Sequence, residues 1–388
     1  MLTVGIFFFT ERYFRWGLAQ NFALAAAQGA VYVVGSLAAN TIAARFGRRR
    51  GLIALYVVLA VLALLAAAAP TPAWLVLTLL AYVLFTAMCW PALESLVASD
   101  ADAHTMSKRV GAYNLVWSGA NAVTFAVSGA VITHWRAGVF LIPAMAHVIS
   151  ALIMWAKPDV DPAAPSSPAP AHGHAEPEPE LVAKRTLAMW LARISLPATY
   201  VVVYSLAAMM PLLPVMQPLE TAQRTLAGSV WMLARFAAFL YLGATVWWHT
   251  RPRILLVAAA VMLIAFIGVT VRPSDVSGAR VIPHAVDLAS MIGWQIALGM
   301  VMGIIYSASL YFGMVLSDGS TEHGGYHEAL IGLGSILGPG TAALTQLVWR
   351  GDVRAGVTTV CCIIGLSVIA AAFASARASR GPANLPTS

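Results

Sequence analysis

Charge is scarce in this chain: Asp, Glu, Lys and Arg make up 10% of its 388 residues, whereas soluble globular proteins contain about 25%. Hydrophobic residues make up 60%, and they gather in runs of about 20, the length of a helix that crosses a bilayer. The weak alternating segments of a transmembrane β-barrel are absent. The composition excludes an ordinary soluble protein and predicts an all-α, polytopic membrane protein embedded in the lipid bilayer.

Cysteine is also scarce: Cys89, Cys361 and Cys362 all lie inside apolar runs. Their spacing excludes a disulfide framework and a cysteine-based metal site, so we expect no metal. The sequence has no HExxH or GxSxG motif, so we expect neither an enzyme nor a cofactor, and proton or ion coupling is left open. No basic segment or small-residue cleavage site marks a signal peptide at the start.

Basic residues exceed acidic ones, with a formal net charge of +7. They occur singly or in small groups between apolar runs, a distribution that argues against a nucleic-acid partner. The densest group is the stretch TIAARFGRRRG, residues 41–51. Short cytoplasmic loops are enriched in Lys and Arg, so we place this loop in the cytoplasm of a cell whose inner (plasma) membrane holds the protein. Alternation from there predicts cytoplasmic N- and C-termini.

Twelve apolar runs predict two sets of six spans. The runs cover Met1–Phe9, Ala23–Ala43, Leu52–Ala69, Ala73–Ala98, Val110–Thr133, Gly138–Ala156, Leu187–Leu213, Leu226–Trp248, Ile254–Val271, Val286–Leu316, Ala329–Val348 and Ala355–Ala376. The first run corresponds to about 14 Å of helix, against a hydrocarbon core of about 30 Å. We interpret it as a first helix without its N-terminal half, followed by an outer loop at Glu11–Asn21. Eleven spans with a short membrane-dipping segment is the alternative.

The segment 157–186 separates the two sets and is rich in Pro, Ala and Glu. Such a segment cannot bury enough apolar surface to fold, which predicts a flexible cytoplasmic linker. The predicted domains are therefore an N-terminal six-helix bundle, 1–156, and a C-terminal six-helix bundle with a short cytoplasmic tail, 187–388. Similar stretches at Gly111–Asn121 and Gly324–Gly334 favour an internal repeat, which is common in secondary transporters.

This arrangement, with an arginine-rich loop between the second and third spans, resembles the major facilitator superfamily. The loop signature of that family is matched by Arg45, Gly47, Arg49 and Arg50, whereas Asn40 and Ala44 replace its Gly and Asp. A second family pattern, Gly-x-x-x-Gly-Pro, is formed by Gly334, Gly338 and Pro339, although on the eleventh span instead of the fifth. We expect these loop and motif residues to serve gating.

The resemblance implies two six-helix bundles that rock about a midplane cavity. The function it implies is secondary active transport of a small solute by a monomeric permease. A membrane sensor or assembly protein that keeps the fold without transporting is the alternative. The resemblance also implies that the first, fourth, seventh and tenth spans line the cavity.

Two charged residues inside spans are the leading candidates for solute or coupling roles. Arg235 lies near the middle of the eighth run, where a charge costs about 2.5 to 3.5 kcal/mol to insert. It is either an anion contact or a member of a charge-relay pair, or else half of a structural ion pair that holds two helices together. Glu94 follows Pro91, which we expect to kink the fourth helix. It either binds a proton or cationic solute, or pairs with a loop arginine.

The remaining candidates are polar or aromatic residues on other runs. His327 and Glu328 open the eleventh run, where they favour proton coupling or gating or, equally, capping of a helix start. The others are candidates for solute contact, or for interhelical hydrogen bonds of about 0.6 kcal/mol each. They are Trp90, Asn114, Trp117, Asn121, Gln28, Tyr32, Gln295, Tyr306 and Tyr311.

Overall fold

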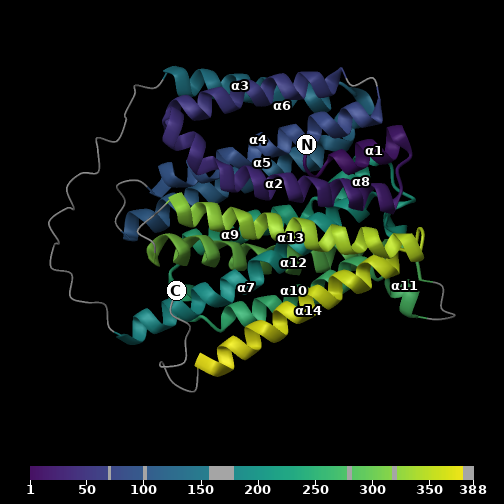
Figure 1. Ribbon diagram of the computed structural model, residues 1–388. Coiled ribbons are helices and arrows are strands. Elements are labelled where there is room, and N and C mark those ends of the chain that lie inside the picture. Colours follow the sequence, from purple (N-terminus) through teal and green to yellow (C-terminus); the bar gives the residue numbers. More distant parts are fainter. Residues whose placement is uncertain (69–70, 99–102, 157–178, 278–281, 317–320, 379–388) are drawn as a thin grey trace.

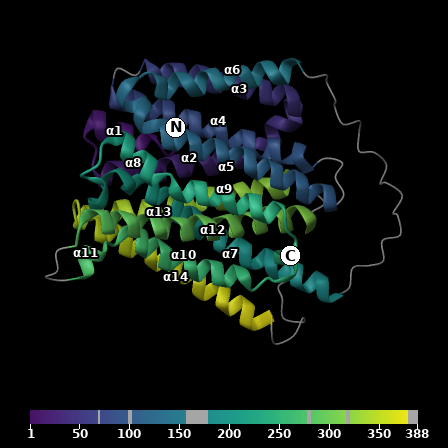
Figure 2. The ribbon, with the colours of Figure 1, turned by 180° about the vertical axis from the view of Figure 1, so that it is seen from behind.

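The computed structural model describes residues 1–68, 71–98, 103–156, 179–277, 282–316 and 321–378. Within these residues every regular element is a helix, and the long helices lie side by side along one direction (Figures 1 and 2). Ten helices are long and apolar enough to cross a membrane. A helix satisfies its own backbone hydrogen bonds, which is required of a segment surrounded by lipid.

The N-terminal half holds six helices. They are α1 (Ile6–Phe14), α2 (Leu18–Phe46), α3 (Arg48–Ala67), α4 (Pro72–Ala98), α5 (Ala103–His134) and α6 (Gly138–Ala156). The helices α3 and α6 pack together and form one outer edge of the molecule (Figure 1). The helices α2 and α5 lie on the side that faces the second half.

The C-terminal half begins at α7 and ends at α14, and it includes short 3-10 turns η1 to η3. Its elements are α7 (Pro179–Met209), η1 (Met210–Leu212), η2 (Pro214–Met216), α8 (Thr221–Gly228), α9 (Val230–Gly243), η3 (Trp247–Thr250), α10 (Ile254–Thr270), α11 (Pro273–Val276), α12 (His284–Leu316), α13 (Thr321–Val348) and α14 (Val353–Ala378). The helices α10 and α14 form the opposite edge (Figure 2).

The two halves meet chiefly where α2 packs against α13 and where α5 packs against α8 and α9. Glycines allow the close approach. A Cβ atom added at Gly29 of α2 would lie 2.6 Å from the carbonyl carbon of Ser335 on α13. One added at Gly129 of α5 would overlap the carbonyl oxygen of Thr221 on α8. Small residues let membrane helices approach closely, so the sequence of this interface fixes its geometry.

The outer surface is apolar, as a bilayer requires. Val116 is 75% exposed, Phe373 is 74% exposed and Leu366 is 67% exposed, each on the face of its helix that points away from the core. Outside a membrane such a surface would be an aggregation liability. The described chain is therefore a multi-pass membrane protein.

The outer loop expected at Glu11–Asn21 is shorter than predicted. Helix α1 continues to Phe14, and α2 begins at Leu18. The chain turns at Arg15, which adopts a left-handed conformation with φ 56°. The polar residues find partners on the other half: Arg12 donates to Thr221 at 3.1 Å, and Arg224 lies 3.7 Å from Glu11.

The eighth span, expected as one run over 226–248, is divided. Helix α8 ends at Gly228, α9 starts at Val230 and ends at Gly243, and a 3-10 turn follows. Gln295 of α12 stabilises the break between α8 and α9. Its Nε2 donates a hydrogen bond to the Ala227 carbonyl at 3.0 Å. Its Oε1 accepts from the Trp231 backbone at 3.4 Å. A polar side chain thus replaces backbone hydrogen bonds that the interrupted helix lacks.

The segment expected to be a linker, 157–186, is only partly described. Helix α7 begins at Pro179, so residues 179–186 are helical. The rest of the expected linker, 157–178, and the expected tail beyond 378 lie outside the described residues. Met1 contributes to the wall of a cavity between the halves and lies among the helices (Figure 1). The cytoplasmic position of the two termini stays a prediction.

Candidate functional site

A cavity of about 400 Å³ lies between the two halves of the protein. The N-terminal half supplies part of its wall from α2, α4 and α5, including Tyr32, Trp90 and Trp117. The C-terminal half supplies Tyr200, Arg235, Tyr306 and Glu328 from α7, α9, α12 and α13. The wall combines apolar and aromatic surface with a few polar groups, the usual composition of a small-molecule site.

Among the described residues, one arginine lines this cavity: Arg235, whose side chain is 4% exposed. Its Cζ lies 4.8 Å from the ring centre of Trp117 on α5 and 5.2 Å from that of Trp231 on α9. In the described part of the chain no carboxylate forms an ion pair with it. The structural ion pair considered from sequence is therefore not formed among these residues.

The position of Arg235 depends on close packing of α9 against α12. A Cβ atom at Gly299 of α12 would overlap the carbonyl oxygen of Trp231, and one at Gly303 would lie 2.6 Å from Cβ of Ala238. The two glycines let the backbones approach. The Arg235 side chain extends from this contact into the cavity wall.

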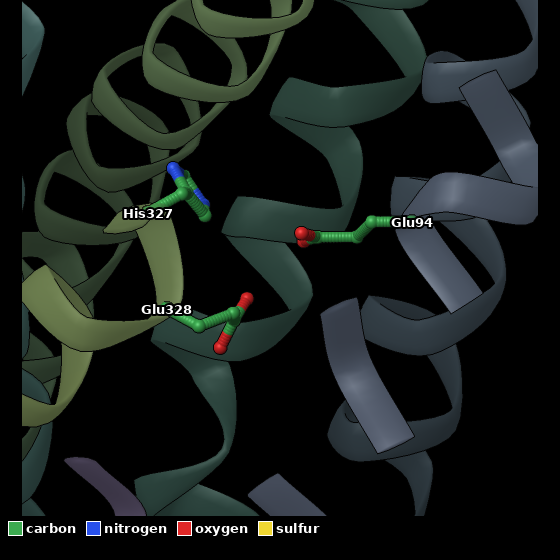
Figure 3. A group of neighbouring side chains, drawn as sticks. All are labelled: Glu94, His327 and Glu328. Carbon is green, nitrogen blue, oxygen red and sulfur yellow. The ribbon is translucent and has the colours of Figure 1, made fainter. Parts of the chain in front are cut away.

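Three titratable side chains meet where α4 faces α13: Glu94, His327 and Glu328 (Figure 3). Each offers one potential ligand atom, and these atoms lie within 4.8 Å of one another. All three side chains are buried, with 1%, 4% and 2% of their surface exposed. Glu94 lies more than 200 residues before the other two in the sequence, and the fold brings the three together across the interface between the halves.

Neighbouring hydroxyl groups hold two of these three side chains. The Tyr32 hydroxyl of α2 donates a hydrogen bond to Oε2 of Glu328. The Ser309 hydroxyl of α12 lies 3.0 Å from Nδ1 of His327.

Glu94 faces Glu328, and among the described residues it forms no ion pair with a loop arginine, the partner considered from sequence. Two charged carboxylates buried face to face repel each other, so the arrangement suits a shared proton or a bound cation. Two carboxylates and an imidazole are also a donor set for a divalent metal.

His327 and Glu328 do not open their helix. Helix α13 begins at Thr321, and both residues lie in its second turn, so helix-start capping is not their role. The prediction placed the helix start too late because the polar residues before Ala329 reduce local hydropathy. His327 and Glu328 are buried inside the protein, but a hydropathy profile scores buried polar residues as it scores a loop.

Aromatic contacts connect the acidic cluster with Arg235. The ring centres of Trp117 and Tyr306 lie 5.1 Å apart, and those of Tyr306 and His327 lie 5.3 Å apart. Trp117 also donates from Nε1 to Asn114 at 3.1 Å, one turn away on α5. Asn121, on the same face of α5, lines the cavity. Asn114, Trp117 and Asn121 are spaced three and four residues apart and so lie on one face of α5.

Several candidates lie away from this cavity. Gln295 forms hydrogen bonds with the backbone at the break between α8 and α9. Tyr311 stacks on His249 of η3, with ring centres 4.1 Å apart and an angle of 10°. Burial and, to a smaller degree, the charge of Arg185 lower the pKa of His249 to about 4, so this ring is neutral at neutral pH. Gln28 is buried on α2 at 1% exposure and does not line the cavity.

The glycine motif of α13 has a packing role. A Cβ atom at Gly334 would overlap the carbonyl oxygen of Pro197 on α7, and one at Gly338 would lie 2.5 Å from the Ser205 hydroxyl. Pro339 follows inside the helix. These residues hold α13 against α7 within the C-terminal half. Gating by this motif remains a prediction.

The arginine loop contacts its own half of the protein. Arg49 donates from Nε to the Met154 carbonyl at 2.9 Å and from its terminal nitrogen to the Trp155 carbonyl at 2.7 Å, at the end of α6. Gly47 has φ +75°, a conformation that glycine adopts without strain. Arg45 lies over its neighbour Phe46 at 5.7 Å, and Arg50 is exposed.

Sequence reasoning missed part of the cavity wall. Tyr82 of α4 and His147 of α6 line it, and the Tyr82 hydroxyl lies 2.7 Å from Nε2 of His147. Tyr204 and Trp231 also line it, as does Tyr200. A histidine inside a span and two tyrosines four residues apart on α7 were available signals. Trp231 had none, because tryptophan is common in apolar helices.

Comparison with known proteins gives a family and a structural relative. The sequence profile of the Major Facilitator Superfamily matches residues 2–339. A crystal structure of the human organic anion transporter MFSD10 (TETRAN) is similar to the structure, with a TM-score of 0.58 at 15% sequence identity. The similarity covers 92% of this chain and 83% of that chain. No sequence match was found among curated proteins.

Proposed function

Because the chain belongs to the major facilitator superfamily, we propose that it is a secondary transporter that moves a small solute by alternating access. The observation that carries this proposal is the cavity between the halves, whose wall holds both aromatic and charged residues. In such transporters the solute site lies near the midplane, and rocking of the halves exposes it to one side and then the other.

We further propose that the Glu94–Glu328–His327 cluster couples transport to protons. Glu94 belongs to the N-terminal half, whereas Glu328 and His327 belong to the C-terminal half. Any rocking motion changes their separation, so a proton shared at short range is released when the halves part. The aromatic contacts from His327 through Tyr306 to Trp117 connect this cluster with the solute cavity.

The proposed orientation places the loop at residues 45–50, the segment between the halves and the C-terminus in the cytoplasm. The uneven distribution of Lys and Arg supports it. The host membrane in this proposal is the plasma or inner membrane of the cell.

Alternating access can be tested without knowing the solute. Cys89, Cys361 and Cys362 are replaced by serine, and one cysteine is introduced at Ala120, which lines the cavity. A membrane-impermeant maleimide is then applied to right-side-out or inverted vesicles. Alternating access predicts labelling from both faces. A cysteine at Ile153, which is 53% exposed on the lipid-facing surface, is the matched control and stays unlabelled.

Labelling from one face only, at every pH tested, would contradict alternating access. It would favour the alternative left open by the sequence, a membrane sensor or assembly protein that keeps the fold and transports nothing.

A further inference from the structure

We propose that the cavity binds a small organic monocarboxylate with a flat apolar body, whose carboxylate lies on Arg235. This inference rests on the proposed transport function and names its class of solute. It begins from the guanidinium, which is 4% exposed and lines the cavity. Its Nε atom has no hydrogen-bond partner in the described part of the chain.

The charge of Arg235 requires an anion. Within a span, an arginine costs about 2.5 to 3.5 kcal/mol to insert, and no described carboxylate forms an ion pair with it. The rings of Trp117 and Trp231 attract it, but each such contact contributes only about 0.5 to 2 kcal/mol. A solute that brings its own negative charge supplies the missing compensation.

A single carboxylate fits this cavity better than two. The planar fork of a guanidinium matches a carboxylate with two parallel hydrogen bonds. Glu328 lines the same cavity and accepts a hydrogen bond from Tyr32. A second anionic group on the solute would approach that carboxyl group and lower the affinity. The charges on the wall therefore select a monoanion.

The rest of the wall selects a flat apolar body. Trp90, Trp117, Trp231, Tyr82 and Tyr306 line the cavity, and aromatic side chains pack well against planar groups. The cavity holds about 400 Å³, at the lower end of the range for drug-sized ligands. A one- or two-ring solute fits this volume.

The test is calorimetric titration of the purified full chain with five probes that differ in charge or shape. These are 2-naphthoate, its neutral amide, 2-naphthylmethylamine, naphthalene-2,6-dicarboxylate and butyrate. We expect 2-naphthoate to bind saturably and at least about tenfold more tightly than each of the others. Equal or tighter binding of the amide, amine or dicarboxylate would overturn the proposal. Absence of saturable 2-naphthoate binding would overturn it as well.

Two arginine variants locate the carboxylate. Arg235→Gln is expected to weaken 2-naphthoate binding about tenfold or more and to leave binding of the amide unchanged. Arg193→Gln is the matched control, because Arg193 also lies over a tryptophan, 5.9 Å from the ring centre of Trp190. Arg193 does not line the cavity, so its replacement leaves binding intact. Equal affinity of both variants for 2-naphthoate would place the carboxylate elsewhere.

The comparison of the five probes on the unaltered protein tests the preference for a flat monocarboxylate even if Arg235→Gln fails to fold. Failure of this proposal is distinguishable from failure of the transport proposal. Two-sided labelling of the cysteine at Ala120 together with binding of the amine or amide would retain alternating access and reject the carboxylate class.

Discussion

Tyr32 on α2 donates a hydrogen bond to Glu328 on α13, so the two halves share a polar contact at the buried centre of their interface. Around this contact, α2 and α13 pack closely because Gly29 and Gly332 have no side chain at the points where the two helices touch. Glu94 reaches the same place from α4. Glu328 therefore belongs both to the contact between the halves and to the proposed proton site. A movement of the halves that breaks the Tyr32–Glu328 contact would also alter the proposed proton site.

Glu94→Gln is expected to uncouple transport from protons. The amide keeps the size of the side chain but cannot share an exchangeable proton with Glu328. In proteoliposomes with 2-naphthoate as solute, an imposed pH gradient should no longer drive accumulation, whereas exchange of labelled for unlabelled solute continues. Glu94→Asp is the control and should retain some accumulation. Wild-type proton-driven accumulation by the glutamine variant would contradict the coupling role.

Gly334→Ala is expected to destabilise the C-terminal half. The new methyl group would overlap the carbonyl oxygen of Pro197 on α7, and overpacking of this kind costs about 1–3 kcal/mol. Thermal unfolding in detergent should show a lower midpoint. Gly293→Ala is the matched control, because nothing lies within 4 Å of the added atom, and its midpoint should not fall. Equal midpoints for the two variants would contradict the packing role of the motif.

Arg49→Gln should lower stability by about 1 kcal/mol, since it removes charged donors from the carbonyl end of α6. The lost contacts are those to Met154 and Trp155. Arg50→Gln, which changes an exposed neighbour, provides the comparison in the same unfolding assay. If both substitutions had the same effect, the loop would act through its total charge and not through this cap.

His249 predicts a pH dependence of stability. Its pKa is lowered from 6.5 to about 4 in the folded protein, so below pH 6.5 the unfolded chain binds more protons than the folded chain. Stability therefore falls as the pH is lowered from about 6.5 to about 4. His249→Phe keeps a ring against Tyr311 and removes the titration. Its midpoint should decline less than that of the wild type over this interval, and an identical decline would contradict the assignment.

The helical architecture could be predicted from sequence because exposing backbone groups or charges to lipid costs several kcal/mol. This cost forces each span to be an apolar helix, so each span can be recognised from its own residues. The runs Gly138–Ala156 and Ile254–Val271 coincide with α6 and α10 to within one residue. The break after Gly228 could not be predicted. A side chain from α12, Gln295, stabilises it, and the local sequence contains no sign of that partner.

The candidate site was predictable where one residue was unusual by itself. Arg235 and Glu94 are charges inside apolar runs, and the structure buries both. Their surroundings were not predictable, because the direction in which a helix faces depends on its neighbours. The meeting of Glu94 with His327 and Glu328 is a property of the α4–α13 contact, and nothing in either segment specifies it.

The guanidinium of Arg235 has one further consequence. It contacts the indole rings of both Trp117, from the N-terminal half, and Trp231, from the C-terminal half. Indole emission responds to a charge beside the ring, so the proposed rocking of the halves would change the light that these residues emit. If alternating access holds, the protein carries an intrinsic optical reporter of that motion, which requires no attached dye.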